Sequence, residues 1–213
     1  MSLPSLDQLL LIVPAFVLAI TIHEASHALV ATLLGEPLPK TQGRLTLNPL
    51  RHLDPFGSIL LIIYGFGWGK PVYVDGRYFR GNPVRSMALV SLAGPLSNLL
   101  LAGLQAVGLR IAPQALLGAP ELFLAIYTYT ILVNIVLAVF NMIPLPPLDG
   151  FSILMGVLPT RLASKLGPLY RYGPVILLAL FILPGLPGPL GIDLLGPVIG
   201  PAQRFLQHLF LGW

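Results

Sequence analysis

Residues 9–34, LLLIVPAFVLAITIHEASHALVATLL, decide the fold of this chain. The stretch is apolar around the motif His23-Glu24-Ala25-Ser26-His27, and it exceeds the roughly 20 residues that an α-helix needs to cross a bilayer. Two histidines four residues apart lie on one helical face, because the helix has 3.6 residues per turn. Ionisable side chains at membrane depth are costly and usually functional. Three of them within five residues therefore indicate a site rather than a polar patch between helices.

The pattern H-E-x-x-H is typical of a metal site. The imidazoles of His23 and His27 can bind one divalent cation, and Glu24 is placed to contact a water on that cation. The chain contains no cysteine, so disulfides and thiolate ligands are excluded. Any further protein ligand must be a histidine or a carboxylate.

Composition places the chain in a lipid bilayer. Of its 213 residues, 55% are hydrophobic and 9% are charged, against about 25% charged in soluble domains. The 22 glycines and 22 prolines indicate broken helices, which a membrane tolerates only where protein or a water-filled cavity covers the backbone. The net charge of +4 comes from scattered basic residues, so we expect no nucleic-acid partner. We expect one domain over residues 1–213, with its core at about 6–158.

The apolar runs predict an all-α polytopic membrane protein. A three-helix catalytic core is expected from spans at about Leu6–Leu34, Ser86–Leu109 and Glu121–Ile143. One or two further C-terminal spans are expected within Pro174–Ile199, which the proline-rich Pro184–Pro189 interrupts. The C-terminal region 174–213 is expected to end in an amphipathic interfacial helix, Pro201–Trp213.

The loop between the first two spans predicts a small β element at the membrane surface. Gly43–Leu47 and Pro71–Asp75 alternate with the period of a strand. The apolar Phe56–Phe66 is too short to span and is expected to be re-entrant or interfacial. His52 is expected at the surface of this loop, without a catalytic role.

Basic residues indicate the topology. Residues 36–85 contain seven of the twelve lysines and arginines, and the segment after the third span contains three more. The positive-inside rule puts both segments in the cytoplasm, in a multi-pass protein of the plasma membrane. His23 and His27 then lie about 10 to 16 Å below the cytoplasmic surface, at 1.5 Å per residue.

A third ligand is expected from residues 141–150, NMIPLPPLDG. Its three prolines cannot continue a helix, so Asp149 lies at a helix break that is still at membrane depth. Asp149 can cap the following helix, Gly150–Leu158, and a residue that binds the metal can do this as well. Ligation is favoured because the histidine pair lacks a third donor elsewhere.

Two asparagines are further candidates. The Asn141 amide can stabilise an oxyanion or bond its own helix end, and the sequence leaves both interpretations open. Asn98, in the second span, is expected to make an interhelical hydrogen bond rather than to act in catalysis.

These groups permit amide hydrolysis. Zinc with three protein ligands keeps a fourth position for water, as catalytic sites do, and lowers the pKa of that water to about 7. Glu24 would take the water's proton and pass it to the leaving amine. A transmembrane substrate must first unwind, and it could then pair with the edge of a strand at 43–47 or 71–75.

These motifs resemble the site-2 protease family of M50-type intramembrane zinc metalloproteases. The likeness covers roughly residues 15–155 and rests on HEASH at 23–27, GRLTLNP at 43–49, HLDP at 52–55, AGP at 93–95 with Asn98, and NxxPxxPLDG at 141–150. The pairing of the first and last motifs within apolar spans is the most specific part. Many members carry a PDZ or CBS domain, whereas this chain resembles a compact stand-alone member.

The resemblance implies a core of three membrane helices with one zinc ion bound by His23, His27 and Asp149. Glu24 would be the base, and the active site would open toward the cytoplasm. The implied substrates are single-span membrane proteins, such as an anti-sigma factor or a signal-peptide remnant. The competing hypotheses are a membrane metal-ion transporter that uses the same cluster and an inactive pseudoprotease. Convergence of the buried groups on one spot argues against the transporter, and an intact Glu24 argues against the pseudoprotease.

Overall fold

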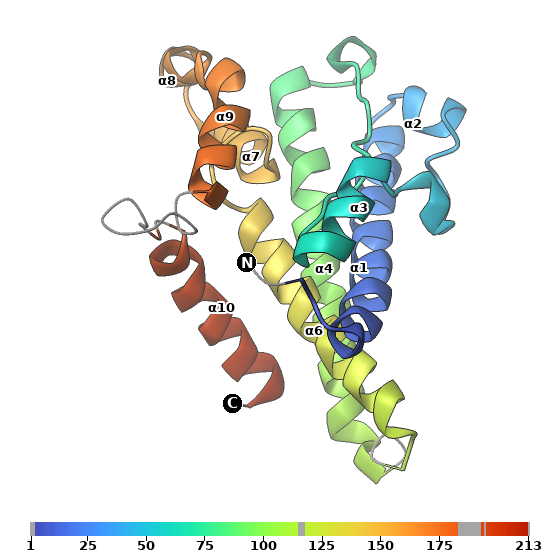
Figure 1. Cartoon of the computed structure of the whole chain (residues 1–213). Coiled ribbons are helices and arrows are strands. Elements are labelled where there is room, and N and C mark those ends of the chain that lie inside the picture. The colour runs from blue at the N-terminus through green and yellow to red at the C-terminus, as the bar shows by residue number, and fades with distance from the viewer. Residues whose placement is uncertain (1–2, 115–117, 183–192, 194, 213) are drawn as a thin grey trace.

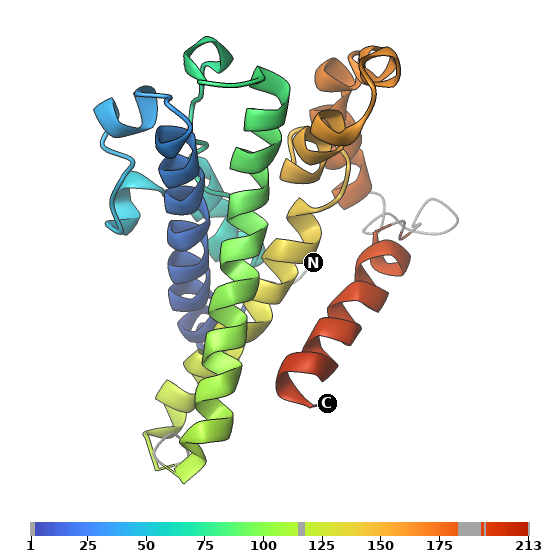
Figure 2. The same cartoon turned by 180° about the vertical axis from the view of Figure 1, so that it is seen from behind.

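The computed structural model describes residues 3–114, 118–182, 193 and 195–212. Three of its helices are long and apolar enough to cross a membrane, namely α1 (Leu6–Leu33), α4 (Pro83–Ile111) and α6 (Glu121–Asn141). The three helices pack side by side (Figure 1 and Figure 2). The predicted all-α polytopic fold is confirmed, and each of the three spans begins and ends within three residues of its expected bounds.

Local sequence explains where two of these helices begin. Ser5 and Gln8 form a capping box at α1, in which each side chain accepts a hydrogen bond from the other residue's backbone N–H. Asn82 caps α4 by accepting from the N–H groups of Val84 and Arg85. Pro83 fits as the first residue of α4 because that position needs no N–H donor.

Small residues bring the core helices close together. Ala15, Ala19, Ala28 and Ala31 of α1 are fully buried. On α4, Ala88 lies so near Gly156 of α7 (Asp149–Val157) that a Cβ at Gly156 would clash with the Ala88 side chain. Small side chains permit such close packing between helices in a membrane. The polar residues on the same faces are therefore brought within hydrogen-bonding reach.

The predicted surface strands were wrong. Within the described residues, the backbone pairs as β structure only at the single bridge between Leu53 and Gly69. Residues 43–47 instead lead from α2 (Leu38–Thr41) into the 3₁₀ turn η1 (Pro49–Arg51), and residues 71–75 lead into η2 (Gly76–Tyr78). Strand-like alternation did not produce strands here because turns begin after both segments, and no partner strand lies beside them in the part of the chain that the structure describes.

Residues 53–69 form a hairpin whose first leg is the helix α3 (Pro55–Tyr64). Leu61 of α3 packs against Phe16 and Ile20 of α1, in the half of α1 that precedes the H-E-x-x-H motif. The returning leg lies so close to α3 that a Cβ at Gly57 would clash with the Trp68 carbonyl. The segment thus forms a hairpin beside α1 (Figure 1), and its re-entrant or interfacial position in the membrane stays a prediction.

The C-terminal helices lie on the other side of α6. α8 (Thr160–Leu166) and α9 (Leu169–Ile182) follow α7 at the end of the bundle where α2 lies (Figure 1). α10 (Gly196–Leu211) packs along α4 and α6 through Leu206 and Phe210. The predicted proline-rich interruption at 184–189 lies outside the described residues, and the interfacial position of the last helix stays a prediction.

Candidate metal centre

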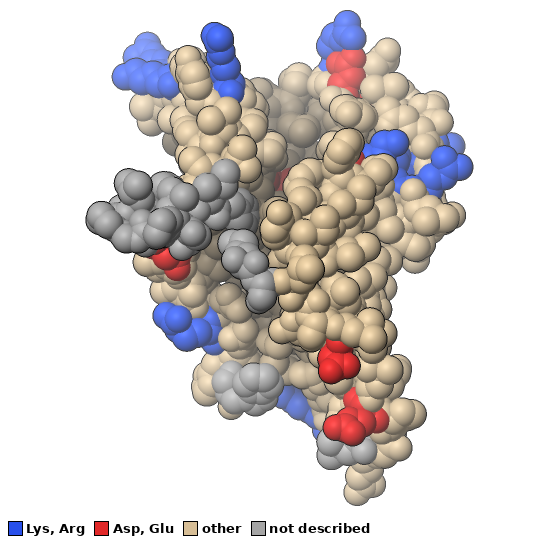
Figure 3. Space-filling view, viewed as in Figure 1, with Lys and Arg blue, Asp and Glu red and all other residues tan. Residues whose placement is uncertain are grey.

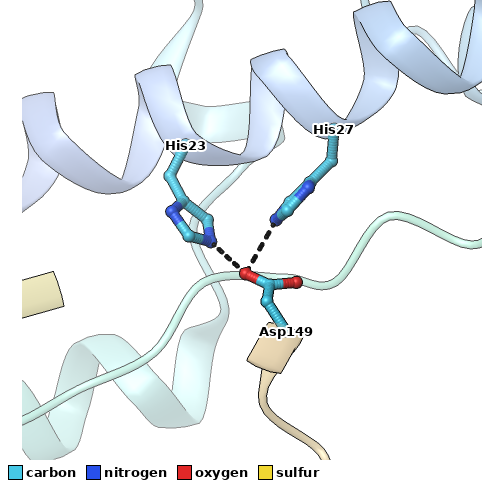
Figure 4. Close-up of side chains that lie close together, drawn as sticks. All are labelled: His23, His27 and Asp149. Atoms are coloured by element: carbon cyan, nitrogen blue, oxygen red, sulfur yellow. Dashed lines mark ion pairs between the residues drawn. The ribbon is translucent and has the colours of Figure 1, made fainter. Parts of the chain in front are cut away.

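His23 and His27 point from α1 into the bundle. Only 3% and 8% of their surfaces are exposed, respectively. Their ring centroids are 4.6 Å apart and the ring planes are perpendicular, so both Nε2 atoms face one point (Figure 4). This geometry follows from their spacing of four residues on a helix whose polar face is covered by α4.

Asp149 meets both rings from the start of α7. Its Oδ2 atom lies 3.2 Å from His23 Nε2 and 3.3 Å from His27 Nε2 (Figure 4). The chain turns irregularly after α6 and enters α7 at Asp149. Asp149 is the first residue of that helix and not its cap, which is Leu148, so the capping interpretation was wrong. Gly150 makes the turn possible because a Cβ there would clash with the Met142 carbonyl at the end of α6.

The far side of each imidazole is hydrogen-bonded to α4. His27 Nδ1 lies 2.7 Å from the Val90 carbonyl oxygen, which can only accept, so Nδ1 carries the proton. His23 Nδ1 lies 2.6 Å from Asn98 Oδ1. The Asn98 amide nitrogen donates to the Ala19 carbonyl at 3.1 Å and to Asn134 Oδ1 at 2.7 Å, which leaves Asn98 Oδ1 to accept from His23.

These bonds leave three acceptors facing one another. A neutral imidazole with a proton on Nδ1 has a lone pair on Nε2, and both lone pairs face the Asp149 carboxylate. Asp149 Oδ2 is buried and has no hydrogen-bond partner among the residues that the structure describes. A cation between the three groups would resolve this arrangement, and orientation of metal-binding histidines by such outer hydrogen bonds is common.

Two of the three spacings within the cluster fit zinc. The candidate ligand atoms all lie within 4.8 Å of one another. Nitrogen and oxygen ligands in a tetrahedral zinc site are about 3.4 Å apart, given bond lengths of about 2.0–2.2 Å. The two histidine-to-aspartate distances of 3.2 and 3.3 Å match that value closely. The sequence therefore predicted a set of three residues that the structure brings together, while their role as ligands stays a prediction.

Glu24 lies buried beside this cluster and faces the loop between α1 and α4. Its Oε2 atom is 3.5 Å from an Arg44 guanidinium nitrogen. Gly69 approaches from the returning leg of the hairpin, where a Cβ would lie 3.1 Å from Glu24 Oε1 and 2.6 Å from Ile20 Cγ1. The loop thus covers Glu24 on two sides, with the Arg44 guanidinium on one side and the backbone at Gly69 on the other.

Sequence reasoning missed Arg44, which it treated as one of the topology-setting basic residues. Arg44 is 3% exposed, and its two terminal nitrogens donate to the carbonyls of Arg51 and Lys70. Arg44 thereby joins the two ends of the α3 hairpin and presents a charge to Glu24. Its place within the GRLTLNP motif was the available signal.

His52 supports the same loop and is fully buried, so the expectation of a surface position was wrong. Its Nε2 donates to the Thr46 carbonyl at 2.7 Å, and its own carbonyl accepts from Lys70 N–H at 2.7 Å. Burial lowers the pKa of His52 below its ordinary value, which favours the neutral ring.

The two asparagine predictions have different outcomes. Asn98 makes the expected interhelical hydrogen bonds, which join α1, α4 and α6, and it also orients His23. Its partner Asn134, fully buried on α6, was not identified from the sequence. The Asn141 amide donates to the Leu137 carbonyl at 2.9 Å, which is the helix-end bond of the second interpretation. Its oxyanion role stays a prediction.

We expect Gly94→Ala to abolish metal binding. A Cβ at Gly94 would lie 2.5 Å from His23 Cε1, His27 Cε1 and His27 Nε2, so the rings would have to leave their positions. Zinc content of the purified protein, measured by atomic emission, should fall from about one per chain to near zero. Gly103→Ala on the same helix is the control, because its nearest neighbour, Phe210, is 3.9 Å away. Full zinc content in both variants would contradict the packing described here.

We expect Asn98→Ala to weaken zinc binding about 10- to 100-fold, the usual loss for an outer hydrogen-bond partner of a metal ligand. The variant removes the acceptor that holds His23 Nδ1–H. Competition with a chromogenic chelator measures the affinity. Asn48→Ala, which removes an exposed turn cap, serves as the control and should bind as wild type does. Equal affinities in the two variants would show that Asn98 does not orient the ring.

Comparison with known proteins finds relatives over most of the chain. "Putative zinc metalloprotease YwhC" of Bacillus subtilis (strain 168) is 38% identical over 207 residues, which cover 93% of this chain and 90% of that protein. Proteins named "Putative zinc metalloprotease Rip2" from Mycolicibacterium smegmatis and Mycobacterium tuberculosis (strain H37Rv) are 32% and 34% identical over 187 residues. Those alignments cover 83% and 84% of this chain, and 68% and 69% of the relatives. No solved structure matches significantly.

A family model agrees with these relatives. The model described as peptidase family M50 matches residues 109–181, which include α6 and Asp149. The relatives extend the match to almost the whole chain, including the H-E-x-x-H helix. The chain therefore belongs to peptidase family M50, the site-2 protease family.

Proposed function

We propose that this protein is an intramembrane zinc endopeptidase that cleaves peptide bonds in or near the transmembrane segments of other membrane proteins. It is a zinc metalloprotease by family and by the names of its relatives. The observation that carries the finer proposal is the convergence of His23, His27 and Asp149 on one point inside the helix bundle, beside a buried Glu24.

The depth of the cluster supports a substrate within the bilayer. His27 and His23 precede the end of α1 at Leu33 by six and ten residues, which is about 9 to 15 Å at 1.5 Å per residue. A peptide bond that reaches this depth belongs to a membrane-embedded or membrane-anchored chain. We propose single-span membrane proteins as substrates, with an anti-sigma factor or a signal-peptide remnant as the expected kinds. Pairing of the substrate with surface strands is not retained, because those segments are not strands.

Each residue of the cluster has a distinct role in this proposal. His23, His27 and Asp149 would hold zinc, which when bound supplies a Lewis acid and a water of lowered pKa. Glu24 would accept a proton from the attacking water and deliver it to the leaving amine nitrogen. Asn98 and Val90 keep both imidazoles in the tautomer that presents Nε2 to the centre. Arg44 balances the charge of Glu24 from the loop side.

The distribution of charge supports an active site near the cytoplasmic side of the plasma membrane. Lys and Arg side chains gather at one end of the molecule, where α2 and α8 lie, and fewer occur toward the other end (Figure 3). Positive residues are enriched in cytoplasmic loops of membrane proteins. The α1 end nearest to His27 is the end that carries this charge.

Substitution of the base tests the proposal. We expect Glu24→Gln to keep zinc and to lower the cleavage rate by at least about 100-fold, because the proton acceptor is lost while the ligands remain. The assay follows a co-expressed, tagged single-span protein that carries the transmembrane segment of a bacterial signal peptide or an anti-sigma factor. The control is Glu121→Gln, an exposed residue at the start of α6, which should cleave normally.

Two results would count against the proposal. Wild-type cleavage by the Glu24→Gln variant would remove Glu24 from the chemistry. Zinc passage into vesicles by the wild type, without cleavage of either substrate, would favour the transporter instead.

A further inference from the structure

The loop between α1 and α4 forms a basic cavity, and Arg44 is the one residue of its lining to which the proposed chemistry gives a role. The cavity measures about 380 Å³ and is lined by Gln42, Arg44, Arg51, Lys70 and Tyr73, with Leu50 and Pro71 completing its wall. Three of these residues are cationic and none is acidic. We call it the basic cavity. An occupant that matches this charge is an anion.

Arg44 is a buried residue in the lining of the basic cavity, and one of its N–H groups has no hydrogen-bond partner among the described residues. Its terminal nitrogens bond the carbonyls of Arg51 and Lys70 and approach Glu24, whereas its Nε is buried without a hydrogen-bond partner among the described residues. A buried donor on a charged group is costly to leave unpaired. A ligand of the basic cavity could therefore be stabilised by accepting a hydrogen bond from Arg44 Nε.

The surroundings of the basic cavity are apolar and exposed. Leu50 and Tyr73 of the lining have 79% and 64% of their surfaces exposed, and the basic Arg51 and Lys70 of the lining are exposed too. Leu47, three residues before Leu50 in the chain, is 67% exposed. In a membrane protein, apolar side chains at such a place contact acyl chains, while aromatic and basic groups lie at headgroup level. The flank of α1 thus offers a cationic cavity next to a surface suited to lipid tails.

We propose that the basic cavity binds the phosphate of an anionic phospholipid headgroup, whose acyl chains lie against Leu47 and Leu50. The charge of the lining selects an anion, and the exposed leucines select a lipid over a soluble phosphate. The headgroup would contact the guanidinium that also faces Glu24, so it would lie directly behind the candidate active site. Binding of lipid here does not depend on the proposed protease activity.

Lipid binding to the full-length, detergent-purified protein tests this directly. Native mass spectrometry would count bound dioleoyl phosphatidylglycerol and dioleoyl phosphatidylcholine per chain across a titration, with inorganic phosphate added in a separate arm. We expect one phosphatidylglycerol to bind at least tenfold more tightly than phosphatidylcholine, and millimolar phosphate to displace it poorly.

Charge-matched variants locate the lipid. Arg51→Gln with Lys70→Gln should weaken phosphatidylglycerol binding about 25-fold, since each basic side chain contributes roughly fivefold. The backbone carbonyls that hold Arg44 remain in this variant, so folding should be unaffected, and the thermal unfolding midpoint checks it. The control removes the same charge from α8, with Arg161→Gln and Lys165→Gln, and should bind within twofold of wild type.

Three outcomes would overturn the proposal. The first is that the wild type binds the two lipids equally tightly, and the second is that the two double variants lose the same amount of affinity for phosphatidylglycerol. The third is that inorganic phosphate, at the concentration at which phosphatidylglycerol binds, displaces this lipid fully. The first two would indicate no selective site, and the third would indicate a site for a soluble anion.

Discussion

The structure depends on two imidazole lone pairs and one carboxylate oxygen that meet inside an apolar helix bundle. Groups of this kind repel one another unless a cation lies between them, and removing them from water is expensive at membrane depth. The chain nevertheless directs all three to one point, with 3.2 and 3.3 Å separating the aspartate oxygen from the two ring nitrogens. A metal ion bound by these three groups would account for their meeting inside the core.

One face of α4 positions the imidazoles of His23 and His27. Val90, Gly94 and Asn98 follow one another at intervals of four residues, so they share the side of the helix that meets α1. Val90 and Asn98 accept the two Nδ1 protons, and Gly94 between them leaves room for both rings. Asn134 on α6 fixes the Asn98 amide in turn. The same face of α4 thus sets the tautomer and the ring orientation of both histidines, and it leaves space for their rings.

The sequence predicted what depends on periodicity and on residue chemistry. The three spans follow from apolar runs, and the meeting of His23, His27 and Asp149 was anticipated from ionisable groups at membrane depth and a proline break. Contacts that depend on tertiary packing were not predictable in this way. The alternation at 43–47 resembled a strand, but this segment contains the buried Arg44, and its Thr46 carbonyl accepts a hydrogen bond from the buried His52. Arg44 and His52 lie in the motifs GRLTLNP and HLDP, but those motifs do not show which contacts bury the two side chains. Asn134 was likewise hidden, because a single asparagine in an apolar run does not reveal its partner.

X-ray absorption at the zinc edge of the purified protein, combined with zinc content, would show whether His23, His27 and Asp149 bind the metal. We expect one zinc per chain, with two imidazole nitrogens and a carboxylate oxygen at about 2.0–2.2 Å. In Asp149→Ala the oxygen of the carboxylate should be lost and the zinc content should fall sharply, whereas Asp193→Ala, a change of an exposed aspartate, should leave both unchanged. An Asp149→Ala protein that keeps its full zinc content and an unaltered spectrum would contradict the account.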